Sequence, residues 1–196
     1  MQTVRCSRGW LRLLLSLALV AIGGERAAAQ AGSVSTARIV TLSAIRAGTL
    51  TVGVTSGMVQ NLPNVIDGAT NNFPSPVVIV TQWNVNPGQT NTVNLMAYFS
   101  VPTQALVGGA TQIPSSRIRG RMTTGLPVAF TPMNQSAVGG IGTVGGSLRL
   151  FSQAITGINK NSSRTDNLDL QLDLVGFPAL APGTYSGTLN LRAVTQ

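Results

Sequence analysis

Three arginines that lie close together are the side chains of this chain best placed to do chemistry. Arg117, Arg119 and Arg121 alternate with apolar or small residues in the segment Ser-Arg-Ile-Arg-Gly-Arg-Met. Successive side chains of a strand point to opposite faces, so the three guanidinium groups are predicted to share one face. Such a stripe could bind the phosphate or carboxylate groups of an anionic polymer. The interpretation that we favour is a solvated strand face that also blocks edge-to-edge pairing.

Four acidic residues follow position 29, namely Asp67, Asp166, Asp169 and Asp173. Asp169 and Asp173 share a face of one predicted strand, but strand rise separates them by about 13 Å, too far for the carboxylate pair of a glycosidase. We interpret this face as solvated. Asp166 and Asn167 offer oxygen ligands that suit calcium, but their spacing matches no calcium loop known to us.

Missing residue types exclude most catalytic chemistry. After position 29 the chain has no histidine, cysteine or glutamate, and its only lysine is Lys160. A serine triad needs a histidine base, thiol chemistry needs a cysteine, and zinc sites use imidazole or thiolate ligands. Lys160 does not stand in a Ser-x-x-Lys motif. We therefore expect a non-catalytic protein without catalytic residues, cofactor or metal site.

The first 29 residues have the features of a secretory signal peptide. Three arginines lie within the first 12 residues, the run Leu11–Ile22 is mostly apolar, and Ala27-Ala28-Ala29 supplies small residues for cleavage. A transmembrane anchor would need about 20 apolar residues, and the run is shorter. We expect cleavage after residue 29, no membrane-spanning segment afterwards, and export to the periplasm, the cell surface or the medium.

Residues 30–196 are predicted to form one domain. These 167 residues carry nine basic and four acidic side chains, and the only cysteine, Cys6, lies in the leader. The domain must therefore be held by its core and its hydrogen bonds rather than by a disulfide. Uncharged polar residues dominate the expected surface, and the segment that contains the three arginines has no aromatic residue, so nucleic acid is not an expected partner.

The clearest strand pattern is near the C-terminus. Leucines at 168, 170, 172 and 174 alternate with Asp169, Gln171 and Asp173, which predicts a strand with one dry face. The turn 176–183 follows, and 184–194 alternates again, so we expect the two strands to form a hairpin.

The most β-branched stretch is 76–85. It predicts a central strand covered on both faces, with Trp83 as a core anchor, and we expect a hairpin with 92–100. Eight to ten strands are expected in all, at spacings of about 8 to 14 residues, and no helix follows the leader. This pattern predicts an all-β fold, a β-sandwich with immunoglobulin-like or related Greek-key connections.

The C-terminal segment Leu-Ala-Pro-Gly-Thr-Tyr-Ser-Gly-Thr-Leu-Asn-Leu-Arg-Ala, residues 180–193, resembles the last strand of known sandwich families. It is similar to secreted bacterial immunoglobulin-like modules and to the pilin-like and spore-coat-U-like families. This resemblance implies a structural role at a surface or in a fimbria. The chain departs from chaperone-assembled pilins because it lacks a cysteine after the leader and ends in Ala-Val-Thr-Gln.

Two functions therefore stand as expectations. The first is a non-catalytic, exported structural or adhesive protein of the bacterial surface, which contacts other surface proteins or its own copies through edge strands. The alternative is a binding module for an anionic polysaccharide, with Arg117, Arg119 and Arg121 as its ligands.

Overall fold

The computed structural model describes residues 34–35, 40–44, 48–88 and 90–196, all within one compact unit, Gly32–Gln196. The expected signal peptide, residues 1–29, lies outside this part. The described residues form strands and one short 3-10 turn, η1 (Ser115–Arg117). None of them forms a helix of the length and apolar character needed to cross a membrane. The all-β prediction is confirmed.

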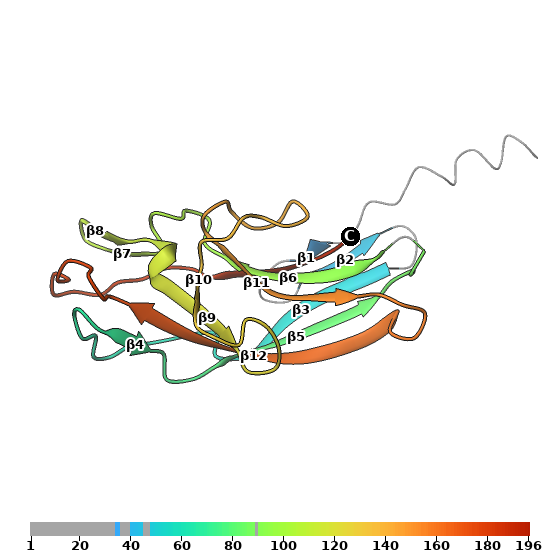
Figure 1. Cartoon of the computed structure of the whole chain (residues 1–196), viewed down its shortest axis with the longest axis horizontal. Coiled ribbons are helices and arrows are strands. Elements are labelled where there is room, and N and C mark those ends of the chain that lie inside the picture. Colours follow the sequence, from blue (N-terminus) through green and yellow to red (C-terminus); the bar gives the residue numbers. More distant parts are fainter. Residues whose placement is uncertain (1–33, 36–39, 45–47, 89) are drawn as a thin grey trace, which may run out of the picture. The chain divides into compact units, whose positions relative to one another are not determined.

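The strands form two main antiparallel sheets and a small hairpin (Figure 1). The seven-stranded sheet has the order β10 (Thr131–Pro132), β9 (Ile118–Met122), β12 (Asn161–Asp173), β5 (Val77–Asn84), β3 (Gly48–Ser56) and β2 (Val40–Ala44), with β4 (Thr70–Asn72) added to β12. The four-stranded sheet has the order β1 (Val34–Ser35), β13 (Asn190–Thr195), β6 (Thr92–Tyr98) and β11 (Ser147–Ala154). The hairpin joins β7 (Leu106–Gly108) to β8 (Thr111–Ile113).

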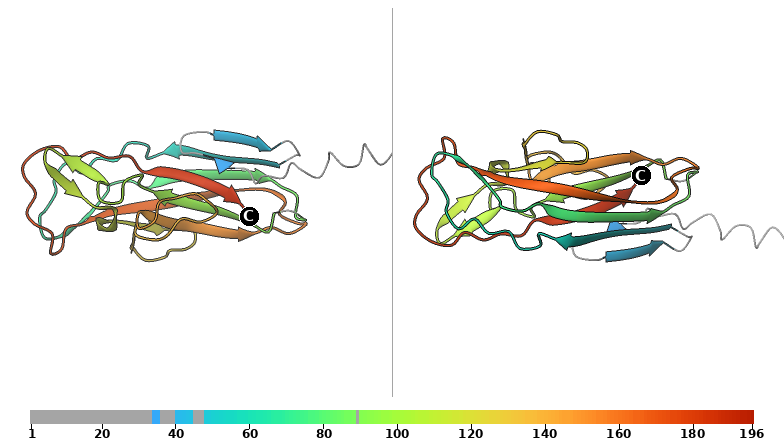
Figure 2. Two further views of the ribbon diagram at one scale, coloured as in Figure 1. Left: turned by 90° about the horizontal axis from the view of Figure 1, so that it is seen from above. Right: turned by 90° about the horizontal axis from the view of Figure 1, so that it is seen from below.

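The two main sheets pack their apolar faces against each other in a β-sandwich. Leu50, Ile79 and Leu168 of the seven-stranded sheet are fully buried in the same core cluster as Leu95 and Leu150 of the four-stranded sheet. Figures 1 and 2 show the sheets as two layers. Among the described residues, eight strands have five residues or more, within the predicted eight to ten. The predicted sandwich is confirmed.

Most neighbouring strands are not consecutive in the sequence, so the chain crosses repeatedly between strands that lie apart. β5 lies in the larger sheet and β6 in the smaller one, and β12 and β13 are divided in the same way. Both predicted hairpins are therefore wrong, since each connection carries the chain from one sheet to the other. β12 also begins earlier than predicted, at Asn161.

The central strand β5 is covered on one face. Ile79 and Trp83 are buried in the core, whereas Gln82 and Asn84 are exposed on the other face. The predicted cover on both faces is wrong. Trp83 is confirmed as a core anchor, because it is 4% exposed and its indole Nε1 donates a hydrogen bond of 2.8 Å to the Asn159 carbonyl.

Candidate functional site

The predicted arginine stripe is divided between a strand and a turn. Arg119 and Arg121 lie on β9 and are partly exposed, while Ile118 and Met122 of the same strand are buried. Arg117 belongs to η1, immediately before the strand. The strand alternation therefore places two of the three guanidinium groups on one outer face.

Arg117 is held by the segment that follows β12. Its Nη1 donates a hydrogen bond of 2.8 Å to the Val175 carbonyl, and its Cζ lies 5.3 Å from the centre of the Phe177 ring. A guanidinium group within about 6 Å of a ring centre is attracted by the π electrons. The 3-10 turn and these two contacts together fix the position of Arg117 beside the strand.

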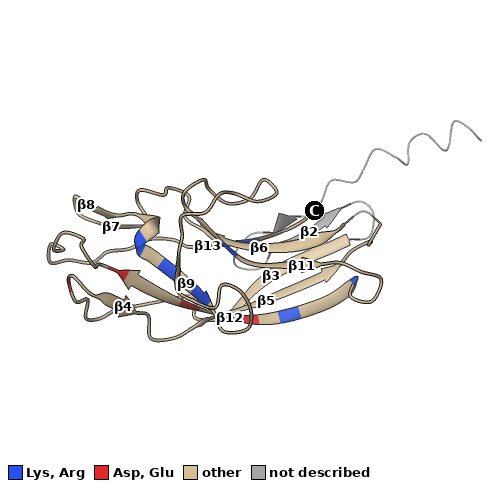
Figure 3. Ribbon diagram, in the orientation of Figure 1, with Lys and Arg blue, Asp and Glu red and all other residues tan. Residues whose placement is uncertain are grey.

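Aspartates of β12 stand next to the arginines of β9. Arg121 lies opposite Asp169 in the strand register, and its Nε and Nη2 donate hydrogen bonds of 3.2 and 2.6 Å to Asp169 Oδ2. Arg119 forms an ion pair with Asp173. Figure 3 shows the basic positions of β9 beside acidic positions of β12. Three positive charges, with that of Arg117, therefore lie close to two negative ones.

The prediction that both aspartates are solvated is wrong for Asp173. This residue is 5% exposed, and its Oδ1 accepts a hydrogen bond of 3.1 Å from the Val175 amide. The guanidinium of Arg119 supplies the positive charge that its burial requires. Asp173 therefore holds the end of β12 together and is not a free acidic group.

A third ion pair lies on the core side of β12. Asp166 is fully buried, and Arg164 donates to both of its carboxylate oxygens at 2.6 Å. Thr124 Oγ1 donates a further hydrogen bond of 2.9 Å to Asp166 Oδ1. The Arg164 Cζ lies 4.3 Å from the ring centre of Phe151, on a strand of the opposite sheet. Asp166, whose oxygens suit calcium, is thus committed to Arg164 and Thr124.

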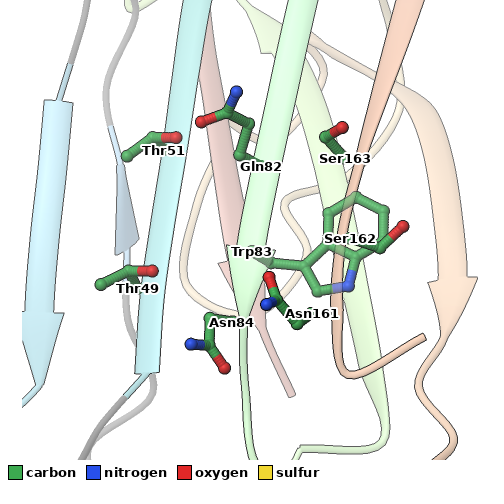
Figure 4. A pocket seen from close by; sticks show the side chains of 8 residues that line it. All are labelled: Thr49, Thr51, Gln82, Trp83, Asn84, Asn161, Ser162 and Ser163. Carbon is green, nitrogen blue, oxygen red and sulfur yellow. The ribbon is translucent and has the colours of Figure 1, made fainter. Parts of the chain in front are cut away.

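Uncharged polar side chains form two rows on the outer face of the seven-stranded sheet (Figure 4). The register aligns Thr49 of β3, Asn84 of β5 and Asn161 of β12 in one row. It aligns Thr51, Gln82 and Ser163 of the same three strands in the next row. We call these six residues the hydroxyl–amide face.

This face surrounds a shallow depression of about 340 Å³. Trp83 and Ser162 complete its lining, although strand alternation turns their side chains toward the core, opposite to those of Gln82 and Asn84. No charged residue of the described ranges lines it, and β3 and β5 carry no charge along their length (Figure 3).

The six side chains of the hydroxyl–amide face are not used in holding the fold together. Within the part of the chain that the structure describes, none of them forms a side-chain hydrogen bond to another residue. Their donors and acceptors are therefore available to solvent or to a ligand. The sequence showed that Thr49 and Thr51 alternate with apolar residues, but it did not show which strands would lie beside them.

The edge strand β11 is protected against pairing with another strand. The Gln135 backbone pairs with Ser147, and its Oε1 accepts a hydrogen bond of 2.9 Å from the Arg149 amide. Near the other end, Asn159 Nδ2 donates to the Ala154 carbonyl at 2.8 Å. The register also shifts between Arg149 and Phe151. Side-chain caps and bulges of this kind disfavour edge-to-edge association.

Comparisons with known proteins give no relative for this chain, because no protein-family model, curated protein or solved structure matches it significantly.

Proposed function

We propose that this chain is a non-catalytic, exported structural or adhesive protein of the bacterial surface, a pilin-like or immunoglobulin-like module. The observation that carries the proposal is the hydroxyl–amide face, since six exposed or half-buried polar side chains form no hydrogen bond to the described part of the fold. The leader sequence and the resemblance of residues 180–193 to surface sandwich proteins also support it.

The contact surface that we propose is a sheet face rather than a sheet edge. The edge of β11 is capped by Gln135 and Asn159, and the opposite sheet ends in β10, which has only two residues. Pairing of copies through edge strands, the contact expected from the sequence, would have to use the β1 or β2 side of the sheets. A partner can bind to the unused hydrogen-bonding groups of the hydroxyl–amide face without adding a strand to the edge of a sheet.

Binding of an anionic polysaccharide by Arg117, Arg119 and Arg121 has less support as a function. Two of these arginines already form ion pairs with aspartates of β12. A polyanion would have to compete with Asp169 and Asp173 and would meet their negative charges. Binding of an anionic polysaccharide is therefore the second proposal, and elution of Asp169→Asn from heparin–agarose tests it.

Localisation and adhesion of cells test the proposed function. Intact cells of the native host are treated with a protease that does not enter them, and the chain is followed by antibody. We expect the chain to be degraded on intact cells, and we expect deletion of its gene to reduce attachment to a surface or to other cells. A chain that resists the protease until the cells are lysed, in a strain whose attachment does not depend on it, would contradict the proposal.

A further inference from the structure

We infer that the hydroxyl–amide face is a binding site for a neutral polysaccharide. The inference rests on the proposed surface function and names the ligand of that surface. It is carried by the geometry of the two rows, by the chemistry of their side chains and by the charge around them.

The two rows form a regular grid. Neighbouring strands lie about 4.8 Å apart, and residues two positions apart along a strand lie about 6.7 Å apart. Each row crosses three strands, so hydrogen-bonding groups recur at fixed steps along a line on an open surface. An extended polymer with a repeated pattern of hydroxyl groups can contact such a grid along its length, whereas a compact small molecule would meet only part of it.

The side chains can match sugar hydroxyl groups. Gln82, Asn84 and Asn161 each carry an amide with donors and an acceptor, and Thr49, Thr51 and Ser163 each carry a hydroxyl that can donate or accept. A sugar hydroxyl also donates and accepts, so pairs of these groups can satisfy each other in either direction. None of the six has to break a hydrogen bond to a described residue before it binds.

The charges favour a neutral polymer. Of the lining residues that the structure describes, none is charged, and Lys160, next to Asn161 in the sequence, is not among them. The arginines of β9 are held by the aspartates of β12. A charged polymer would therefore find no opposite charge among the described residues of the hydroxyl–amide face, while a neutral polymer brings no charge that needs a partner there.

Protein partners fit this face less well. Protein interfaces depend on a few anchors, most often tryptophan, tyrosine or arginine, that fill pockets. Among the described residues that line the depression, Trp83 is the one aromatic residue, and it is buried as part of the core. The next row along the strands pairs Gly53 with the half-buried Val80, which offers a small apolar contact of the size of a sugar C–H face.

Affinity electrophoresis of the purified protein tests the inference. The gels contain hydroxyethyl cellulose, galactomannan or dextran as neutral polymers, and one gel contains polygalacturonate as an anionic polymer. The test variant is Thr51→Ala, Gln82→Ala and Ser163→Ala combined, which removes one row. A matched control replaces the same three residue types at exposed positions away from this face, namely Thr188→Ala, Gln104→Ala and Ser152→Ala.

We expect at least one neutral polymer to retard the protein and its control variant, and we expect the row variant to bind that polymer roughly tenfold more weakly, because three hydrogen bonds are lost. Equal retardation of both variants, retardation by polygalacturonate alone, or self-association without retardation would overturn the inference. Urea unfolding of both variants shows that loss of binding is not loss of fold. A chain that is degraded on intact cells but is retarded by no neutral polymer refutes this inference and leaves the proposed function standing.

Discussion

Arg164 and Asp166, two residues apart on β12, point toward the core of the sandwich and form an ion pair with two hydrogen bonds of 2.6 Å. Asp166 is fully buried, and the guanidinium group lies over Phe151 of the opposite sheet. The pair thus links the two sheets, and the next inward-facing residue of β12 after Asp166 is the buried Leu168. Removal of one partner leaves the other charge in an apolar environment.

This pair gives the first prediction. We expect Arg164→Met to lower the free energy of unfolding by about 3 kcal/mol, because Asp166 loses its charged partner. The double variant Arg164→Met with Asp166→Leu should recover much of that loss, since no buried charge remains. Urea unfolding measures both. Arg149→Met, at an exposed arginine of β11, is the control, and an equal effect of the two single arginine variants would contradict the account.

The second prediction compares two arginines of β9. Asp173 is buried and Asp169 is partly exposed, so loss of their partners should differ in cost. We expect Arg119→Ala to destabilise the protein by about 2 to 3 kcal/mol and Arg121→Ala by about 1 kcal/mol or less. Thermal or urea unfolding checks the order. If Arg121→Ala costs more, the assigned roles of the two ion pairs are wrong.

The third prediction tests the proposed polyanion site. Asp169→Asn removes the negative charge beside Arg121 and should release its guanidinium for an anionic ligand. We expect this variant to elute from heparin–agarose at a higher salt concentration than Asp67→Asn, which makes the same change of net charge at an exposed loop position. Identical elution of the two variants would speak against the arginines as an anion-binding stripe.

The fourth prediction concerns the edge of β11. Gln135→Ala removes the side chain that caps the Arg149 amide, which should expose a backbone donor to another copy of the chain. We expect faster self-association in concentrated solution, followed by light scattering. Asn134→Ala, at the neighbouring exposed position, should have no such effect. Unchanged scattering for Gln135→Ala would show that the cap is not needed.

The faces of the strands could be predicted from the sequence, because burial repeats every second residue. The leucines of β12 lie in the core as their alternation indicated, whereas the continuous apolar run of β5 did not show that its second face is exposed. Strand partners could not be predicted in the same way. A connection such as 85–91 can join two strands of one sheet or carry the chain to the other sheet, and alternation is satisfied by either arrangement.

The ion pairs could not be predicted from the sequence, because they depend on which strands pair and in which register. Arg121 and Asp169 are 48 residues apart, and they meet only because β9 pairs with β12 in one register. Arg164 precedes the alternating leucines that predicted the strand, yet it belongs to β12 and faces inward, where it contacts Asp166 and Phe151. The hydroxyl–amide face likewise depends on the alignment of β3, β5 and β12.

Adhesion of whole cells gives the most direct test of contact through the hydroxyl–amide face. A strain that lacks the gene is complemented with the wild type, with the row variant (Thr51→Ala, Gln82→Ala, Ser163→Ala) or with its matched control, and surface amounts are equalised by antibody. We expect cells with the wild type or the control to attach to a surface coated with the retarding neutral polysaccharide, and cells with the row variant to attach poorly. Equal attachment by all three strains would contradict the account.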